Sequence, residues 1–402
     1  MLWRWFQEEL PAVMLTGPRG CGKTTTALRR ASSTLRLDVP GQAAAFRGAP
    51  DEVLGGLDPP VLIDEWQSEP ESLGAVKRAV DAGGGQGRFL ITGSVRSRLS
   101  VDTWPGTGRI TPIPMFCLTQ GELEGRAGSV RVVERLFGPD EPTVGMLHDA
   151  PGLVDYAAMV TRGGFPEAIR LSPGVRGRWY HGYVEHLVHR DVQELQAVRN
   201  PQVLARLLEA AAHNTAGTPA VQSLAEQVGA DHRTVGSHLD LLEELRIIER
   251  LPAWGSNRLN RAVKSPKVFL TDTGMAAHLM GDDQQGLLLD ASRLGRIIET
   301  FVLAQLRPLL HPKVRALHFR DGNGRREVDL VLESTKGRIV GLEIKASNTA
   351  TKQDARHLAW LRDQVGDQFV RGLVLHTGPM TFPLGDRLWA VPIASLWRTA
   401  LG

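Results

Sequence analysis

Short apolar runs alternate with longer amphipathic segments along the first 120 residues. Runs at residues 12–15, 60–63 and 88–91 have the length and aliphatic content of buried strands, and residues 34–39 add a strand of alternating pattern. Strands separated by helical segments predict a parallel sheet with helices on both of its faces. The N-terminal part of the chain is therefore expected to be an α/β domain.

A different pattern occupies residues 219–245, where apolar positions recur at helical spacing in two short stretches. Ala225 lies where the two helices would touch, Gly229 lies at the turn between them, and Asp231 is the expected cap of the second helix. This spacing is typical of a helix-turn-helix. Two further strands, which complete the order of a winged helix, are expected at residues 246–251 and 267–270.

The last segment predicts a helix, three strands, a second helix and a fourth strand. The first two strands are joined by Asp-Gly-Asn-Gly at residues 321–324, which is a strong hairpin signal. Residues 121–151 are marked by Gly and Pro and are expected to form loops at a boundary. The expected C-terminal elements are the helices 293–306 and 352–365 and the strands 316–320, 326–333, 338–346 and 370–375.

Length and composition are those of a globular protein with several domains. The 402 residues exceed what one hydrophobic core usually supports, so two to four domains are expected. No apolar run approaches the ~20 residues of a membrane span, and the N-terminus lacks a signal-peptide pattern, so we expect a cytoplasmic protein. Cys21 and Cys117 are too few for a disulfide framework, and a net charge of +3 only weakly favours an acidic partner.

The first apolar run leads into a glycine-rich loop that carries the clearest chemistry of the chain. Residues 17–24 fit G-x-x-x-x-G-K-[ST] at every fixed position, between an expected strand and an expected helix. The glycines let backbone N–H groups face a phosphate chain, and the start of the helix adds its positive end. Lys23 is expected to reach the β- and γ-phosphates of ATP, and Thr24 to bind Mg²⁺. The expected nucleotide-binding residues of this loop are Gly17, Pro18, Arg19, Gly20, Cys21, Gly22, Lys23, Thr24 and Thr25.

Two acids end the strand at residues 60–65, in the Walker B pattern. Asp64 is expected to hold the Mg²⁺ shell, and its neighbour Glu65 is expected to polarise the attacking water. Ser94, at the end of the next strand, is expected to contact the γ-phosphate or the water, with a plain strand-end turn as the alternative. The arginines that follow are either arginine fingers for a neighbouring subunit or solvated surface residues; they are Arg96, Arg98 and Arg109.

Several motifs together resemble a family of P-loop ATPases. Besides the P-loop and the two acids, the chain carries Thr-Gly-Ser at 92–94, Gly-Gly-Phe-Pro-Glu at 163–167 and Arg-Asp at 190–191. This combination resembles bacterial and archaeal AAA+-like ATPases with a C-terminal domain of unknown function 4143. The Gly-Phe-Pro element also resembles one in the helical lid of signal-transducing and origin-recognition-type AAA+ ATPases, which implies that Pro166 lies against the adenine; a helix-initiating turn is the alternative. Trp66 stands where such relatives usually have an aliphatic residue.

The helix-turn-helix and the wing after it carry the residues expected to meet DNA. The second helix is expected to expose Arg233, Thr234 and His238 toward nucleic acid. Basic residues of the wing, opposed by Glu249 alone, would neutralise phosphates without reading sequence. Winged helices also bind proteins, so a protein partner is the alternative. The wing residues expected to contact DNA are Arg258, Arg261, Lys264 and Lys267.

Acidic residues and a lysine in the last segment form a second candidate site. Strand alternation places Glu343 and Lys345 on one face, and Asp329 is expected on the neighbouring strand. Asp329 and Glu343 could hold Mg²⁺ while Lys345 orients water for phosphodiester cleavage. The order Glu299, Asp329, Glu343-x-Lys345 within these elements resembles the PD-(D/E)xK fold of restriction endonucleases. A solvated strand face is the alternative, and the proline expected before Asp329 is absent.

The expected fold class is α/β, with four domains. They are an AAA+-type P-loop NTPase core at 1–135, a helical lid at 136–205, a winged helix-turn-helix at 206–285 and a restriction-endonuclease-like domain at 286–402. The expected function is binding and hydrolysis of ATP with Mg²⁺ by an assembly of several copies, such as a hexamer, that remodels or processes DNA. Cleavage by the C-terminal domain stays open. The alternatives are a nucleotide-gated switch that binds DNA or protein without cutting, and a nuclease gated by ATP.

Overall fold

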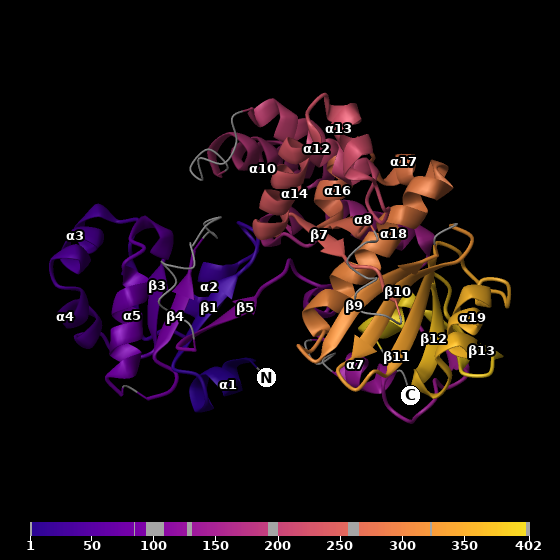
Figure 1. Ribbon diagram of the computed structural model, residues 1–402, viewed down its shortest axis with the longest axis horizontal. Helices are drawn as coiled ribbons and strands as arrows, with labels where there is room; N and C mark the ends of the chain where they lie inside the picture. Colours follow the sequence, from indigo (N-terminus) through magenta and orange to yellow (C-terminus); the bar gives the residue numbers. More distant parts are fainter. Residues whose placement is uncertain are drawn as a thin grey trace. The chain divides into compact units, whose positions relative to one another are not determined.

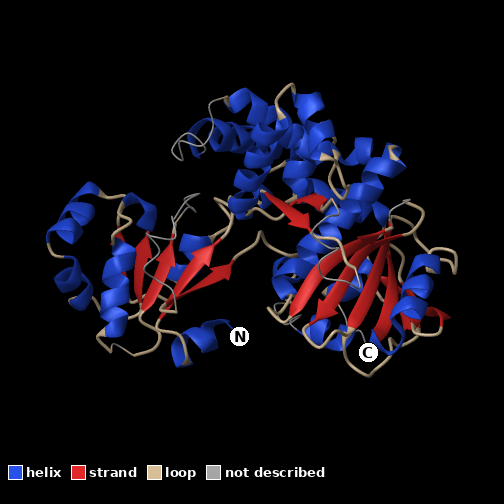
Figure 2. Ribbon diagram, viewed as in Figure 1, coloured by secondary structure: helices blue, strands red, loops and turns tan. Residues whose placement is uncertain are grey.

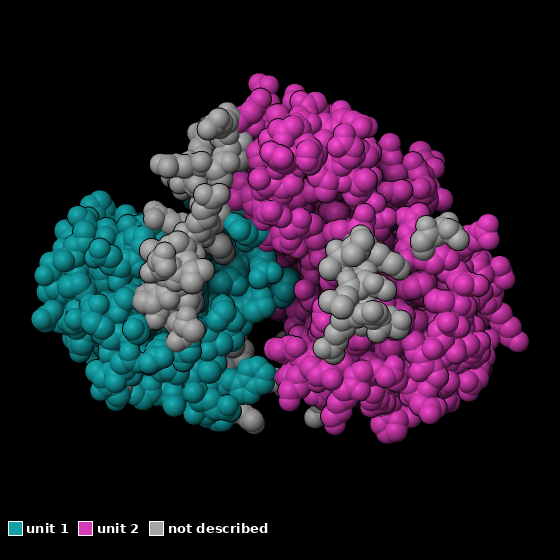
Figure 3. Space-filling model, viewed as in Figure 1, with its two compact units in different colours: residues 1–116, 244–246 teal, residues 117–243, 247–402 magenta. Residues whose placement is uncertain are grey.

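The chain forms two compact units, shown in different colours in Figure 3. Unit 1 comprises residues 1–116 with 244–246, and unit 2 comprises residues 117–243 with 247–402. The predicted division into four domains stays a prediction. The computed structural model describes residues 2–83, 85–93, 108–126, 131–191, 200–255, 265–321 and 324–398.

Unit 1 is built on a parallel sheet, as the alternation of apolar runs predicted. The described part of the unit contains five strands in the order β2-β3-β4-β1-β5, and every neighbouring pair is parallel (Figure 1). The Walker B strand β3 therefore does not lie beside the P-loop strand β1, because β4 runs between them. The strands are β1 (Ala12–Thr16), β2 (Ser33–Arg36), β3 (Val61–Asp64), β4 (Phe89–Thr92) and β5 (Ile110–Pro114).

Helices cover both faces of this sheet, which confirms the predicted layer order. On one face Met14 and Ile91 pack with Phe46 and Val76 of the covering helices. On the other face Leu15, Leu62 and Leu90 pack with Phe6 and Ala27. The helices of unit 1 are α1 (Leu2–Glu8), α2 (Lys23–Leu28), α3 (Pro40–Gly48), α4 (Pro50–Gly55), α5 (Ser72–Asp81) and the short 3-10 turn η1 (Trp66–Ser68).

The first part of unit 2 is mainly helical, as Figure 2 shows. The prediction of loops in residues 121–151 holds only in part, because the segment also contains helical turns and a short strand, β6 (Gly145–Met146). The capping box of Thr119 and Glu122, which starts α6, is the local signal that the interpretation missed. These helices are α6 (Gln120–Leu123), α7 (Arg131–Leu136), α8 (Leu153–Arg162), α9 (Pro166–Ile169), α10 (Pro173–His186), the π-helical η3 (Leu187–Asp191) and α12 (Pro201–His213).

The helix-turn-helix and the strand pair after it have the predicted element order. Helices α13 (Val221–Val228) and α14 (His232–Glu244) are followed by β7 (Ile248–Leu251) and β8 (Lys267–Leu270). The two strands are antiparallel, with Leu251 paired to Lys267. Next come α16 (Thr273–Leu279), α17 (Gln284–Leu289) and α18 (Ala291–Leu306), the last of which contains the predicted helix at 293–306.

The C-terminal part of unit 2 is a mixed sheet that includes all the predicted strands. In the described residues the strand order is β6-β13-β14-β12-β11-β10-β9. The predicted hairpin is confirmed, because β9 and β10 are antiparallel, while β11 and β12 are parallel and connected through α19. Leu358 and Leu361 of α19 pack in one core with Val331 and Phe369. The elements are β9 (Val314–Arg320), β10 (Glu327–Ser334), β11 (Ile339–Lys345), α19 (Arg356–Val365), β12 (Phe369–His376), β13 (Met380–Gly385) and β14 (Leu388–Pro392), with 3-10 turns η4 (Arg307–Leu309), η5 (Gly366–Gln368) and η6 (Ile393–Leu396).

Candidate functional site

The P-loop connects the end of β1 to the start of α2 in a conformation that requires its glycines. Gly20 and Gly22 have φ angles of 76° and 101°, in the left-handed region that side chains disfavour. A Cβ atom on Gly17 would collide with the backbone carbonyl oxygen of Met115. The loop thus has the backbone that its sequence pattern predicts. Within it Cys21 is buried, and burial raises the pKa of its thiol.

Side chains from the start of α2 and the end of β3 are in contact at the carboxyl end of the parallel sheet. Lys23 is only 8% exposed and its Nζ donates to the carbonyl oxygens of Gly17 and Pro18, at 3.0 Å each. The Thr24 hydroxyl donates to Oδ1 of Asp64 at 2.9 Å. The structure therefore brings together the lysine, the hydroxyl and the carboxylate that the sequence assigned to phosphate and Mg²⁺.

Thr92 is a partner of Asp64 that the sequence analysis missed. Its hydroxyl donates to the same oxygen, Oδ1 of Asp64, at 2.6 Å, from the end of β4. Because β4 lies between β1 and β3, the end of β4 is next to the Walker B carboxylate, and Thr92 is the residue whose side chain faces it. Ser94, the residue predicted for this strand end, lies outside the described residues, as do Arg96 and Arg98. Arg109 pairs with Asp81 at 2.8 Å on the surface.

Glu65 is held by its local backbone and by a neighbouring side chain. Its φ of 54° is in the left-handed region, which is uncommon for a residue with a Cβ atom. Gln67 donates from Nε2 to Oε2 of Glu65. A Cβ atom on Gly93 would collide with Oε1 of Gln67 and would also crowd the Trp66 ring, so the glycine leaves room for both side chains. Gln67 thus fixes the carboxylate that we expect to polarise water.

Pro166 is the first residue of α9 in unit 2, so the structure shows the helix-initiating turn that was its alternative interpretation. Phe165, just before it, packs with Trp179 and Tyr183 of α10 at ring-centroid distances of 5.4 Å and 4.8 Å. Gly163 has a φ of 70°, and a Cβ atom there would collide with the Tyr180 hydroxyl. The adenine contact of Pro166 stays a prediction.

The turn of the helix-turn-helix has the predicted geometry. Gly229 ends α13 with a φ of 65°, and Oδ1 of Asp231 accepts from the backbone N–H groups of Arg233 and Thr234 at 3.0 Å each. Arg233 is exposed and Thr234 is half-buried. His238 was predicted to be exposed, which is wrong: only 5% of it is accessible, because it lies on the core side of α14.

The prediction that basic wing residues contact DNA needs correction. Arg258, Arg261 and Lys264 lie outside the described residues. Arg250 pairs with Asp240 at 2.6 Å and with Glu243, so its charge is already balanced. Lys267 was predicted to contact DNA phosphates, which is wrong for this structure because the residue is only 1% exposed. Its side chain points away from solvent, into a cluster of carboxylates.

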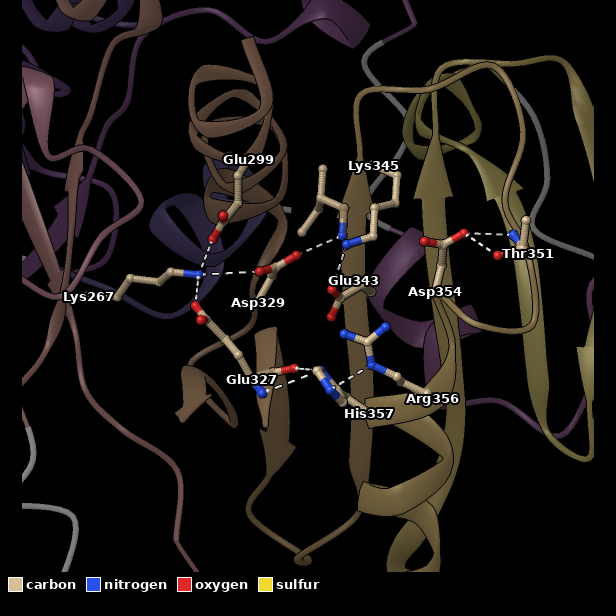
Figure 4. A network of polar contacts seen from close by, with 11 residues as sticks. Lys267, Glu299, Glu327, Asp329, Glu343, Lys345, Thr351, Asp354, Arg356 and His357 are labelled. Carbon is tan, nitrogen blue, oxygen red and sulfur yellow. Dashed lines mark hydrogen bonds and ion pairs between the residues drawn. The ribbon is translucent and has the colours of Figure 1, made fainter. Parts of the chain in front are cut away.

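This carboxylate cluster surrounds the Lys267 ammonium in unit 2 (Figure 4). Nζ of Lys267 lies 2.5 Å from Oε1 of Glu299, 3.1 Å from Oε1 of Glu327 and 3.3 Å from Oδ1 of Asp329. Burial alone would lower the pKa of Lys267, but the three carboxylates together raise it above its usual value. The lysine is therefore a permanent cation at the centre of this cluster.

Asp329, Glu343 and Lys345 lie close together, as predicted. The antiparallel register pairs Leu330 with Leu342, and continuing it by one residue places Asp329 opposite Glu343. Oδ2 of Asp329 accepts from the N–H of Ile344 at 2.8 Å, and Lys345 donates to Oε1 of Glu343 at 2.9 Å.

Glu343 is buried and incompletely paired. Oε2 of Glu343 has no hydrogen-bond partner among the described residues. Burial and the charge of Asp329 raise the pKa of Glu343 to about 8, although Lys345 opposes the shift. The predicted alternative of a solvated strand face is therefore wrong for Glu343.

The two sites differ in how well they fit Mg²⁺. At the P-loop, the Thr24 hydroxyl and the Asp64 carboxylate are hard oxygen ligands already in contact, which suits the ion. In the C-terminal cluster, the described residues contain no group of three side chains placed to hold a metal. At the predicted Mg²⁺ site, Oδ1 of Asp329 contacts the Lys267 ammonium and Oδ2 accepts from the Ile344 N–H, while Oε1 of Glu343 accepts from Lys345. Only Oε2 of Glu343 is without a partner among the described residues, so this site suits Mg²⁺ less well than the P-loop does.

These features define unit 1 as the core of a P-loop NTPase with a parallel sheet. Comparison with family models confirms the resemblance: residues 9–124 match the model described as AAA domain, and residues 294–396 match the domain of unknown function DUF4143. Residues 153–286 match a further domain of unknown function, DUF8612. The AAA-domain match and the site geometry support a nucleotide-binding ATPase.

Two similar whole proteins are described only as uncharacterized. An uncharacterized protein of Mycobacterium tuberculosis and one of Mycobacterium bovis are each 29% identical over 395 residues, covering 97% of this chain and 81% of theirs.

Among solved structures, a RuvB variant of Thermotoga maritima has 21% identity and a TM-score of 0.26, covering 60% of this chain and 83% of its own. A Thermococcus gammatolerans complex of McrB AAA+ hexamers with McrC has 10% identity and a TM-score of 0.21, covering 70% and 74%. In the described part of the chain, no helix is both long and apolar enough to cross a membrane.

Proposed function

We propose that unit 1 binds ATP with Mg²⁺ and hydrolyses it. The observation that carries this proposal is the hydrogen bond between Thr24 and Asp64, beside a buried Lys23 whose ammonium donates to two carbonyl oxygens of the loop. Mg²⁺ bound with the nucleotide neutralises phosphate charge. Thr24 and Asp64 would hold this ion, and the N–H groups of residues 17–25 would bind the phosphates.

Hydrolysis requires a group that orients water, and Glu65 is the residue we assign to it. Its carboxylate would accept a proton from the attacking water, in the position that Gln67 fixes. Lys23 would exchange its bonds to the loop carbonyls for bonds to the β- and γ-phosphates. Lys23→Ala should therefore abolish nucleotide binding or turnover, whereas Glu65→Gln should bind ATP and fail to hydrolyse it. Normal turnover in both variants would remove the ATPase assignment.

We further propose that the protein acts on DNA through its helix-turn-helix. Support comes from the start of α14, where Arg233 is exposed and Asp231 fixes the backbone turn. Phosphates bind well at such a helix start when a cationic side chain lies beside it. Arg258, Arg261 and Lys264 would add positive charge from the wing.

Two modes of action follow from this assignment. A motor assembled from several copies would use hydrolysis to remodel or process DNA, and its ATPase rate should rise when DNA is added. A switch would bind nucleotide tightly, turn over slowly and change its affinity for DNA or a protein partner.

One experiment separates these modes. ATP hydrolysis by the full chain is measured in Mg²⁺ with and without single-stranded, duplex and branched DNA, and the DNA is then examined for cuts. A rate increase with intact DNA supports the motor. A slow rate that DNA does not change, with nucleotide-dependent DNA affinity, supports the switch. Cuts that require Mg²⁺ and ATP would support the nuclease gated by ATP.

A further inference from the structure

The carboxylate cluster of unit 2 already contains a cation, and it belongs to the protein. We infer that Lys267 takes the place that a divalent metal would occupy among Glu299, Glu327 and Asp329. The C-terminal domain therefore binds no metal ion at these acids and does not cleave DNA with them. This inference does not depend on the ATPase or DNA proposals.

Distances and burial place the ammonium at the centre of the cluster. Three carboxylates from α18 and β10 lie within 3.3 Å of Nζ, and 1% of the lysine is exposed (Figure 4). Carboxylates that converge on one buried point repel one another unless a cation lies among them. The lysine supplies that charge from β8, a strand that pairs with β7 and not with the C-terminal sheet.

The acid at the centre of the predicted metal site has both oxygens engaged. Oδ1 of Asp329 contacts the Lys267 ammonium and Oδ2 accepts from the Ile344 N–H. Mg²⁺ requires near-octahedral oxygen coordination and Ca²⁺ requires six or more oxygens. A divalent ion close enough to bind Asp329 would also lie next to the positive charge of Lys267, and the repulsion would expel one of them.

Glu343 does not change this conclusion. One of its oxygens accepts from Lys345, and the other is buried without a hydrogen-bond partner in the described structure. A metal ligated there would need further oxygens, and the acid opposite it in the strand register, Asp329, is engaged with Lys267. The C-terminal domain thus keeps the acid and lysine order of the PD-(D/E)xK motif around an internal ion pair.

The ion pair also joins two segments that the sequence analysis placed in separate domains. Lys267 belongs to the strand pair after the helix-turn-helix, and Glu299 and Asp329 belong to the predicted nuclease-like domain. Breaking one partner of a buried pair is strongly destabilising, because it leaves the remaining charges uncompensated. Lys267 therefore attaches β8 to α18 and β10.

The test measures thermal unfolding of the full chain without nucleotide, in EDTA and in saturating Mn²⁺ or Mg²⁺. Metal binding to the P-loop side chains is common to all variants, so only differences between variants report on the cluster. The melting temperature of the wild type should rise on addition of metal by as much as that of the double variant Asp329→Asn, Glu343→Gln. A larger shift in the wild type would show a metal at these acids and would overturn the inference.

The second arm removes the internal cation. Lys267→Ala should lower the melting temperature in EDTA and gain a Mn²⁺-dependent rise of about 5 °C or more over the wild-type response, because the freed carboxylates can bind the ion. Lys352→Ala, which removes an exposed lysine of the same unit, should behave as wild type. A folded Lys267→Ala protein with the wild-type metal response would overturn the role of Lys267 as a metal substitute.

Failure of Lys267→Ala to fold leaves the inference testable. The wild-type comparison in EDTA and Mn²⁺ needs no change at Lys267. Glu299→Gln provides a milder variant, which keeps the lysine paired with Glu327 and Asp329 and should still show no added metal response. Incubation of wild type with DNA in Mn²⁺ should leave the DNA intact; cuts lost in the Asp329→Asn, Glu343→Gln variant would overturn the inference.

Discussion

The hydroxyl of Thr24 donates a hydrogen bond to the carboxylate of Asp64 at 2.9 Å, between residues forty positions apart in the chain. Thr24 is the second residue of α2, the helix after the P-loop, and Asp64 ends the strand β3. The same carboxylate oxygen also accepts from Thr92. Folding of unit 1 thus brings together the two oxygens that we propose as Mg²⁺ ligands.

The hydroxyl of Thr24 should be essential for Mg²⁺-dependent hydrolysis. Thr24→Val keeps the shape of the side chain and removes the ligand, and we expect the rate to fall by at least about 100-fold. Thr24→Ser keeps the hydroxyl and should retain most of the rate. Phosphate release in Mg²⁺ measures both, and equal rates for the two variants would contradict a ligand role.

Gln67 should affect the rate of ATP hydrolysis by holding the Glu65 carboxylate in position. Gln67→Ala removes the donor that fixes the carboxylate, so kcat should fall roughly tenfold while ATP affinity stays unchanged. Gln86→Ala, at an exposed glutamine of unit 1, is the matched control and should leave kcat unaltered. Nucleotide binding and steady-state hydrolysis separate the two effects. A change in affinity with normal kcat would assign Gln67 to nucleotide binding.

Arg233 should carry part of the DNA affinity. If it meets a phosphate, Arg233→Ala weakens binding to all sequences and reduces the slope of log affinity against log salt by about 1. Arg178→Ala, at an exposed arginine of α10, is the control for loss of a positive charge. Titration of labelled duplex at several salt concentrations provides the slope. An unchanged slope in Arg233→Ala would indicate a protein partner for this helix.

His376 should make the stability of unit 2 depend on pH. It is buried, its Nδ1 accepts from the Gly378 N–H at 3.1 Å, and its Nε2 donates to the Met380 carbonyl at 2.9 Å, so the ring is neutral. Burial lowers the pKa of His376, although the bond to Met380 opposes the shift. The folded protein therefore binds fewer protons than the unfolded chain below pH about 6.5, and stability falls as the pH falls from there through the lowered pKa.

Thermal unfolding between pH 8 and pH 5 tests this dependence. His376→Gln cannot take up the proton, so its melting temperature should fall less on acidification than that of the wild type. The remaining slope reflects other groups of unit 2: burial also lowers the pKa values of His238 and His278, whereas the pKa of Glu343, raised to about 8, makes stability rise as the pH falls. His232→Gln, at an exposed histidine, should keep the wild-type slope. Parallel slopes for His376→Gln and the wild type would contradict the prediction.

Local sequence was sufficient wherever neighbouring residues decide the structure. The P-loop is predictable because its glycines and its lysine interact within a few residues of one another. The Asp231 cap is predictable because its carboxylate accepts from residues two and three positions ahead. The strands β1, β3 and β4 are short apolar runs buried on both faces, which periodicity detects. In contrast, β13 (Met380–Gly385) is largely exposed or half-buried and carries no such signal.

The amino-acid sequence by itself determined the class of the N-terminal domain, the order of most elements and the residues that we propose for the nucleotide site. Only the tertiary structure decided which side chains lie together over long separations. The sequence predicted Lys267 to be a DNA-contacting residue of the wing, yet it is buried against Glu299 and Asp329, which are 32 and 62 positions away in the chain. The sequence predicted His238 to contact DNA, yet it lies on the buried side of α14. The physical reason is that charge and periodicity describe a residue and its helix or strand, whereas the partner of a buried charge is set by how elements pack.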